Sequence, residues 1–326
     1  MKKYVFFILI LLVSVSCTKP ASNTNNNNNT CKQPIAPSRL DSTEVFPKDY
    51  PLNTDISGSP VDANSAAIIS AIGSYGIHPD FGSGLYSGAP IGIPFVLVCG
   101  DQAKVPITFR ANSYDGDYGS ESDPGPYPIP DNAPIEGNGN GDSHVLVCDV
   151  ENDKLYELYN ASKNSGAGWS ASSGAVFDLS KDFYRPDGWT SCDAAGLPIL
   201  PCLVRYDEMA RGKINHAIRF TLSSGHVYNG YVNPARHKVN GGGTLGSSLP
   251  MGGRIRLKSS FDITGYSKNM QVILQAMKTY GLILADIGSN MFVSGAPDSR
   301  WDNNDLATLK AIKNTDFEVV QLGTIK

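Results

Sequence analysis

The stretch that decides the fold is HVLVCDVENDKLYELYNA, residues 144–161. Within it, Val145 and Val147 alternate with Leu146 and Cys148, and successive side chains of a strand point to opposite faces. A polar turn, ENDK, follows, and the apolar run LYELY then returns. This pattern predicts a β-hairpin.

Short apolar runs with turn residues at their ends recur along the chain and predict further strands. They cover residues 93–100, 104–111, 174–180, 214–222, 226–232 and 253–262. In the last run, Arg254, Arg256 and Lys258 alternate with apolar residues, which places three cations on one strand face. Residues 281–295 predict two more strands around a turn at Gly288.

Helical periodicity occurs in only a few segments. Residues 267–281 carry the clearest example, with Ser267 as a candidate N-cap, an apolar stripe that includes Ile273 and Met277, and Gly281 as a stop. Residues 63–76 and 303–312 predict two more helices.

These elements predict a mainly β fold. The chain has 33 glycines and 21 prolines, which suits many turns, and it shows no internal repeat. We expect one β-rich domain over residues 48–326, a twisted β-sandwich or jelly-roll-like architecture with a few packing helices. Residues 112–144 form a connection long enough to predict a functional loop.

The first residues predict export. Two lysines precede an apolar run of about a dozen residues, too short to span a bilayer but suited to a signal peptide. Small residues before Cys17 resemble a bacterial lipobox, which implies cleavage there and lipidation of that cysteine. We therefore expect a signal peptide at 1–16 and an Asn-rich tether at 17–47. The protein is then lipid-anchored in the bacterial cell envelope, periplasmic or surface-exposed; plain secretion is the alternative.

Charge and cysteine content narrow the function classes. The formal net charge is -4, from 27 basic and 31 acidic residues without a block of one sign, so nucleic-acid binding is not expected. Beyond Cys17 the cysteines are odd in number. Cys192 and Cys202 are close enough to close a small loop, while Cys99 and Cys148 are either free buried thiols or a pair across strands.

Acids and tyrosines alternate in the 112–144 loop. Tyrosine rings stack on sugars and carboxylates accept hydroxyl hydrogen bonds, so Tyr127, Glu136 and Asp142 are candidate glycan-binding or catalytic residues. His144 follows as a candidate proton shuttle, or as a histidine bonded to the backbone. The loop equally suits a solvated acidic segment, with calcium conceivable but unsupported by the spacing of its acids.

A second group lies in DGWTSCDAAGLPILPCLVRYDE, residues 187–208. Asp193 is expected to be at least partly buried, where it is either paired with an arginine or protonated as a general acid. Trp189 is a candidate sugar platform or a core residue. Asp207 and Glu208 are expected in an exposed turn.

Cations and late aromatics complete the candidates. Arg236 and His237 follow a predicted strand and, with the cations of 253–262, suggest a cationic cluster for acidic glycans or ordinary ion pairs. Trp301 is a further candidate substrate-binding residue. The chain has no Gly-x-Ser-x-Gly elbow, phosphate-binding loop or zinc-helix motif, so no metal or other cofactor is expected.

Several strings resemble a family of secreted bacterial and fungal proteins of uncharacterised activity. They are GDSHVLVCD, RPDGWTSCDAAGLPILP and KTYGLILADIGSN, and the likeness runs over residues 50–325. Some members occur with carbohydrate-binding modules. The resemblance implies one domain with an extracellular role that involves polysaccharide, and it supplies no catalytic residues. Leu52, Cys192 and Cys202 depart from the family pattern.

The leading hypothesis is a monomeric lipoprotein that acts on polysaccharide or oligosaccharide as a glycoside hydrolase with two carboxyl groups. The expected pair is Asp193 with Asp142 or Glu136, lined by His144, Arg236 and His237. A non-catalytic glycan-binding lipoprotein and a polysaccharide lyase with an Arg/His cluster are the alternatives.

Overall fold

The computed structural model describes residues 35, 40, 45–110 and 118–326. The expected signal peptide, Cys17 and most of the tether lie outside the described residues. Residues 32–326 belong to one compact unit, and its architecture is mainly β with several sheets and few helices, as predicted.

The largest sheet has six strands that come from distant parts of the sequence. Their order is β1 (His78–Asp80), β16 (Phe292–Ser294), β11 (Ile218–Leu222), β15 (Leu282–Ile287), β14 (Arg254–Leu257) and β17 (Phe317–Val319). β1 runs parallel to β16 and β11 runs parallel to β15, whereas the other neighbours are antiparallel. The sheet is therefore mixed.

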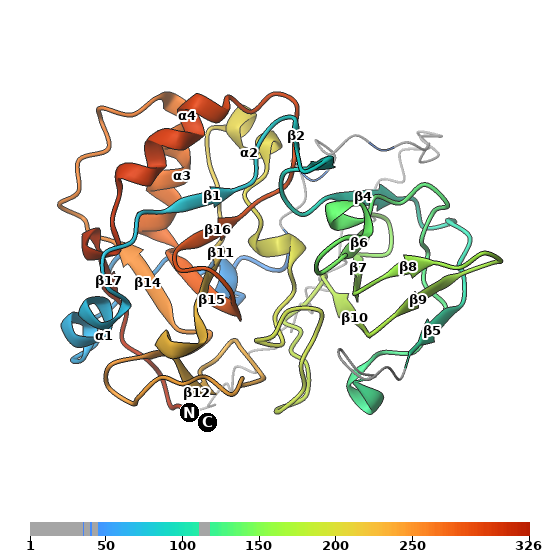
Figure 1. The fold of residues 1–326 in the computed structure, drawn as a ribbon, viewed down its shortest axis with the longest axis horizontal. Coiled ribbons are helices and arrows are strands. Elements are labelled where there is room, and N and C mark those ends of the chain that lie inside the picture. The colour runs from blue at the N-terminus through green and yellow to red at the C-terminus, as the bar shows by residue number, and fades with distance from the viewer. Residues whose placement is uncertain (1–34, 36–39, 41–44, 111–117) are drawn as a thin grey trace, which may run out of the picture. The chain divides into compact units, whose positions relative to one another are not determined.

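The predicted hairpin forms the centre of a four-stranded sheet, which Figure 1 shows beside the first one. The order is β10 (Ser173–Asp178), β7 (Lys154–Tyr159), β6 (Val145–Asp149) and β4 (Phe95–Val98). β6 and β7 pair antiparallel, with Val147 opposite Tyr156, and β4 runs parallel to β6. The hairpin prediction is confirmed.

Three small sheets complete the strands. They consist of β2 (Leu85–Tyr86) with β3 (Ala89–Pro90), β5 (Ile107–Phe109) with β9 (Trp169–Ala171) and β8 (Ser162–Lys163), and β12 (Val227–Tyr231) with β13 (Leu249–Met251).

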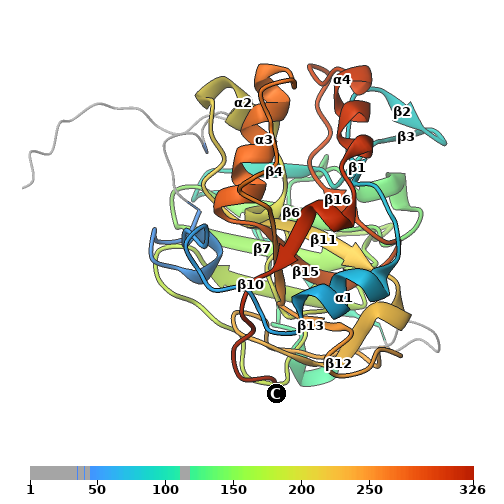
Figure 2. The ribbon, with the colours of Figure 1, turned by 90° about the vertical axis from the view of Figure 1, so that its left-hand side faces the viewer.

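The described chain has four α-helices: α1 (Ser65–Ile72), α2 (Tyr206–Arg211), α3 (Lys268–Thr279) and α4 (Asn303–Ala307). Figures 1 and 2 show α1, α3 and α4 on the side of the six-stranded sheet that faces away from the four-stranded sheet. Ser267 caps α3 as predicted, since its hydroxyl accepts a bond from the Met270 amide at 3.3 Å. Short 3-10 turns lie at Pro51–Asn53, Gly119–Glu121, Glu136–Gly139, Leu200–Cys202, Ser224–His226, Thr308–Ala311 and Asn314–Asp316. No helix of the described chain is both long and apolar enough to cross a membrane.

The alternation in β6 serves two hydrophobic cores. Leu146 and Cys148 pack into the larger core with the six-stranded sheet, and Val145 and Val147 pack into a second core on the other face. Both faces of this strand are therefore buried, which explains why its sequence is apolar throughout.

The expectation of an exposed turn at Asp207 and Glu208 is wrong. Both acids lie in α2, where their exposures are 3% and 1%. Arg205 pairs with both of them, and His216 Nε2 lies 2.9 Å from a Glu208 carboxylate oxygen. The Arg205 guanidinium thus allows two acids at the start of a helix to be buried.

The cysteines differ from both alternatives that were open for Cys99 and Cys148, since one of these two is free and the other is not. Cys148, Cys192 and Cys202 are buried free thiols, and Cys99 is disulfide-bonded. Neither the 192–202 loop nor the 99–148 pair is present.

Candidate functional site

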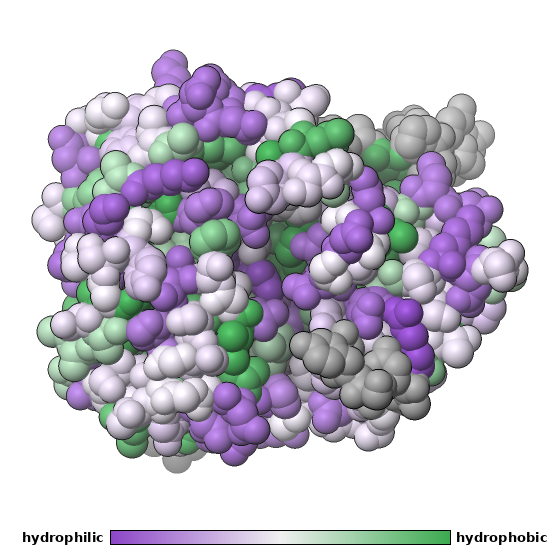
Figure 3. Space-filling view, viewed as in Figure 1, coloured by the Kyte–Doolittle hydropathy of each residue, from purple (hydrophilic) through white to green (hydrophobic). Residues whose placement is uncertain are grey.

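A cleft of about 760 Å³ opens between the six-stranded sheet and the segment that precedes β6. Its walls come from the ends of β1, β15 and β16, the β2–β3 hairpin and residues 136–144. Figure 3 shows hydrophilic residues gathered in a hollow near the centre of this face. Its volume is in the range of small-molecule binding sites.

Sheet topology brings the polar residues of the cleft together. Asp80 ends β1, and Asp286 lies near the end of β15, opposite Thr221 of the parallel strand β11. The ends of parallel strands meet at one edge of a sheet, where ligand sites commonly form. Residues 60 or more positions apart in sequence therefore line one opening.

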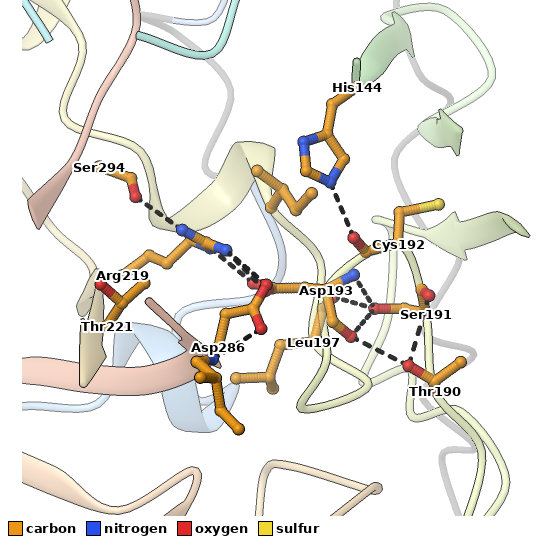
Figure 4. A network of polar contacts seen from close by, with 12 residues as sticks. His144, Thr190, Ser191, Cys192, Asp193, Leu197, Arg219, Thr221, Asp286 and Ser294 are labelled. Atoms are coloured by element: carbon orange, nitrogen blue, oxygen red, sulfur yellow. Dashed lines mark hydrogen bonds and ion pairs between the residues drawn. The ribbon is translucent and has the colours of Figure 1, made fainter. Parts of the chain in front are cut away.

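Arg219 of β11 organises the floor of the cleft (Figure 4). Its Nε and Nη2 each donate to a carboxylate oxygen of Asp193 at 2.8 Å, and Nη2 also lies 3.2 Å from Asp286. Its Nη1 donates to the Ser294 hydroxyl at 2.7 Å. The guanidinium is thus held by three side chains, and Asp193, only 1% exposed, is a buried ion-pair partner.

Asp286 is the carboxyl group with the most perturbed acidity in the cleft. Loss of hydration and the charge of Asp193 raise its pKa to about 7, although Arg219 opposes the shift. The Ile287 amide donates to its Oδ1 at 2.7 Å, and about a quarter of the side chain (24%) is exposed. A carboxyl group of this kind carries a proton near neutral pH and can donate it.

Glu136 has the opposite protonation state because of His144. Its carboxylate lies 2.5 Å from His144 Nδ1, and His144 Nε2 lies 2.9 Å from the Cys192 carbonyl oxygen. Burial of the ring opposes its charge, but Glu136 raises the pKa of His144 to about 9. Burial likewise opposes ionisation of Glu136, yet the charge and hydrogen bonds of His144 lower its pKa. The pair is an imidazolium and a carboxylate, so His144 positions Glu136 and is not a free base.

Local backbone geometry fixes this pair. The Glu136 amide donates to the His144 carbonyl at 3.0 Å, which closes residues 136–144 into a loop. Gly137 and Asn138 have positive φ values of 60° and 53°, conformations that favour glycine and asparagine. The GNGNG sequence is therefore suited to turning Glu136 back toward His144.

Charges of the cleft are mostly negative. Loss of hydration raises the pKa of Asp80, and the neighbouring Glu136 charge contributes. The charges of Arg219 and His144 are already paired with Asp193 and Glu136, so the negative groups left for a ligand are Asp80 and Asp142 at the exposed rim, even though Asp286 carries a proton. Anionic ligands are accordingly disfavoured. Among the described residues, no group of three or more His, Cys, Asp or Glu is arranged to hold a metal ion.

The structure brings together three of the four predicted catalytic residues. Asp142, Glu136 and His144 line the cleft, whereas Asp193 lies behind Arg219 and outside the lining. The paired alternative for Asp193 is therefore the one that the geometry supports, and its assignment as a general acid is corrected.

The predicted aromatic platforms lie elsewhere. Tyr127 is 1% exposed, and its hydroxyl donates to the Asp123 carbonyl at 2.7 Å. Trp301 is 4% exposed, packs on Phe81 and Tyr206, and donates from Nε1 to a backbone carbonyl. Both are core residues, which corrects their prediction as substrate-binding residues.

Trp189, Arg236 and His237 also fall outside the described lining of the cleft. Trp189 is half-buried, and the Arg185 guanidinium lies 5.6 Å from its ring. Arg236 pairs with Asp187 at 2.7 Å, and His237 Nδ1 lies 2.8 Å from the Ala194 carbonyl oxygen.

The cationic cluster proposed around Arg236 does not form at this cleft. Of the cations predicted on the 253–262 strand, Arg256 pairs with Glu318 at 2.8 Å, and Lys258 Nζ donates to the Thr315 carbonyl at 2.8 Å. Arg256 therefore has the ion pair that the alternative interpretation expected, whereas Lys258 has a backbone partner.

Sequence reasoning missed Asp80, Arg219 and Asp286 as site residues. Arg219 and Asp286 are charged residues within the apolar strands IRFTL and LILADI, whereas Asp80 ends the short strand HPD, which is not apolar. A charged residue inside an apolar strand was a signal that the sequence offered. Only the pairing of the strands shows that Asp80, Arg219 and Asp286 line the same cleft.

Comparison of the chain with protein-family models, curated proteins and solved structures gave no match. Function is therefore inferred from the cleft itself.

Proposed function

We propose that the protein hydrolyses glycosidic bonds in this cleft, with Asp286 as the general acid and Glu136 as the ionised carboxylate. The observation that carries the proposal is that one cleft holds two carboxyl groups whose surroundings shift their pKa values in opposite directions. Such a division of roles between two carboxyl groups is the basis of glycoside hydrolysis.

The reaction follows from these protonation states. Asp286 gives its proton to the glycosidic oxygen as the bond to the anomeric carbon breaks. Glu136, a weak base because of His144, forms an ester with that carbon. Water then attacks the same anomeric carbon while Asp286 takes a proton from that water, and the bond to Glu136 breaks so that Glu136 leaves as a carboxylate. This route retains the anomeric configuration.

The substrate class follows from the lining of the cleft. Asp80 and Asp142, which have no ion-pair partner among the described residues, disfavour uronic acids and suit neutral or amino sugars. Tyr86 at the rim is 75% exposed and can stack on a sugar ring, while Asn140 and Ser289 offer polar atoms to hydroxyl groups. The lyase alternative loses support, because its proposed cations, Arg236 and His237, are not at the cleft.

Cellular location remains part of the proposal and rests on the sequence. The apolar run before Cys17 and the Asn-rich tether support an envelope lipoprotein that acts on polysaccharide near a membrane surface. A monomer suffices, since all residues assigned to the reaction come from one chain.

A panel digest tests the proposal. The chain from residue 18 onward would be incubated with neutral, amino-sugar and uronic-acid polysaccharides, and reducing ends and ultraviolet absorbance would be read together. We expect reducing ends without absorbance from a neutral or amino-sugar glycan, and loss of that signal in Glu136→Gln but not in Asp101→Asn, an exposed control. Glycan binding without product would support the non-catalytic glycan-binding protein, and an absorbing product would support a lyase.

A further inference from the structure

A second cavity, of about 430 Å³, lies at the beginning of β14. It has no lining residue in common with the cleft, so it is a separate site. Its described lining residues are Pro51, Thr54, Ile56, Ser59, Pro60, Val232, Asn233, Pro234, Gly252, Arg254, Val320, Gln321, Leu322 and Gly323. None of these is acidic, and Arg254 is the one cation among them.

Arg254 is buried without a counter-charge. Its exposure is 9%, and no carboxylate within the described chain lies within ion-pair distance of it. Its Nη2 donates to the Pro51 carbonyl, but its Nε is buried and has no hydrogen-bond partner. Pro51 also lines the cavity, which places the guanidinium at its wall.

Comparison with Arg219 shows what is missing at Arg254. Arg219 is just as buried, but its Nε forms an ion pair with a carboxylate oxygen of Asp193 at 2.8 Å. Asp193 raises the pKa of Arg219, whereas burial lowers the pKa of Arg254 to about 10. A buried charge that lacks both an ion pair and a full set of hydrogen bonds is costly to keep.

We propose that this cavity binds an oxyanion, a carboxylate or phosphate group of a small ligand, with Arg254 as its counter-charge. A planar guanidinium matches both groups, and that of Arg254 lines the cavity with no carboxylate of the described chain in ion-pair distance and with one donor, Nε, unused. Thr54, Ser59 and Gln321 at the same wall supply polar contacts for the remainder of the ligand. The cavity volume suits a ligand of metabolite size.

Calorimetric titration with inorganic phosphate and with glucuronate tests this proposal. We expect wild type to bind at least one probe, and the stronger one identifies the source of the oxyanion. Gln321→Glu adds a carboxylate at an exposed position of the cavity, where it competes for Arg254, so we expect binding to weaken about tenfold or more. Gln275→Glu, an exposed change on α3 with the same charge, should leave binding unchanged.

Arg254→Lys and Arg254→Met give a second measure. Lysine keeps the positive charge but lacks the paired planar N–H donors of the guanidinium, and methionine lacks both. Affinity for the oxyanion should therefore be highest for wild type, lower for Arg254→Lys and lowest for Arg254→Met. Because Arg254 is buried, thermal unfolding of each variant would be recorded first, and Gln321→Glu remains decisive where an arginine variant fails to fold. The proposal is overturned if wild type binds neither probe at millimolar concentration, or if Gln321→Glu binds as tightly as Gln275→Glu.

Discussion

At the scale of single residues, the account depends on the proton carried by Asp286. Its pKa of about 7 lies far above that of a free aspartic acid, because the carboxyl is poorly hydrated and close to Asp193. A raised carboxyl pKa means that the folded state holds the proton more tightly than the unfolded state. The stability that this proton provides is therefore present at acidic pH and is lost as the pH rises from about 4 to about 7.

Asp286→Asn should consequently stabilise the protein at alkaline pH while it impairs catalysis. We expect the free energy of unfolding of the variant to exceed that of wild type by about 1–2 kcal/mol at pH near 8, and by little at pH near 4. Urea denaturation at both pH values measures this. A variant that is less stable than wild type at alkaline pH would contradict the assigned acidity.

His144 governs the second carboxyl group. His144→Gln removes the imidazolium that lowers the pKa of Glu136, so the acid limb of the pH–rate profile should move to higher pH. Stability should fall by about 1–3 kcal/mol, since the glutamine leaves buried polar groups poorly satisfied. An unchanged acid limb, with activity lost equally at all pH values, would indicate that His144 has only a structural role.

At the scale of elements, the ion pair between Asp193 and Arg219 joins the 187–205 segment to β11. Arg219→Met leaves a buried carboxylate without its partner and should destabilise the protein by about 3–5 kcal/mol. Asp193→Leu combined with Arg219→Met should recover part of that loss. Urea denaturation of the single and double variants measures the coupling. Additive losses would show that the pair is not the feature that holds the segment.

Elements whose signals are local were predictable from the sequence. The β6–β7 hairpin and the Ser267 cap of α3 follow from patterns within 20 residues and are confirmed. The parallel pairing of β1 with β16 joins segments more than 200 residues apart, and no local pattern encodes it. α2 was missed because two adjacent acids indicated exposure, whereas Arg205 compensates their charges and His216 lies within hydrogen-bond distance of Glu208 inside the fold.

Half of the charged residues in the cleft were predictable from the sequence, because they lie close together along the chain. Glu136, Asp142 and His144 lie within one loop, so a sequence pattern of acids before a hairpin could identify them. Asp80 and Asp286 come from strands that meet only through the sheet. Tyr127 and Trp301 were misassigned because the sequence alone does not distinguish an aromatic residue that stacks on a sugar from one that packs in the core.

At the scale of the whole molecule, the charge of the cleft predicts substrate choice. Turnover of a neutral or amino-sugar glycan should exceed that of a uronic-acid glycan, and added salt should reduce the difference because it screens the carboxyl groups at the rim. Rates on matched oligosaccharides at low and high salt measure this. Preference for the uronic acid would contradict the proposed substrate class.

The proposed anchor predicts where the whole protein resides. Wild type should sediment with membranes, and Cys17→Ser should release the folded domain into the soluble fraction, because the lipid is the proposed attachment. Immunoblotting of the two fractions measures the distribution. Equal membrane association of both proteins would exclude lipidation at Cys17 as the anchor.

One measurement tests the central claim most directly, the assignment of Asp286 as the proton donor to the leaving group. Asp286→Asn would be compared with wild type on a natural glycan and on an aryl glycoside of the same sugar, whose leaving group departs without a proton. We predict that the variant loses about 100-fold or more in kcat on the glycan and far less on the aryl glycoside. Equal losses on both substrates, no loss on either, or a wild type inactive toward every glycan would contradict the account.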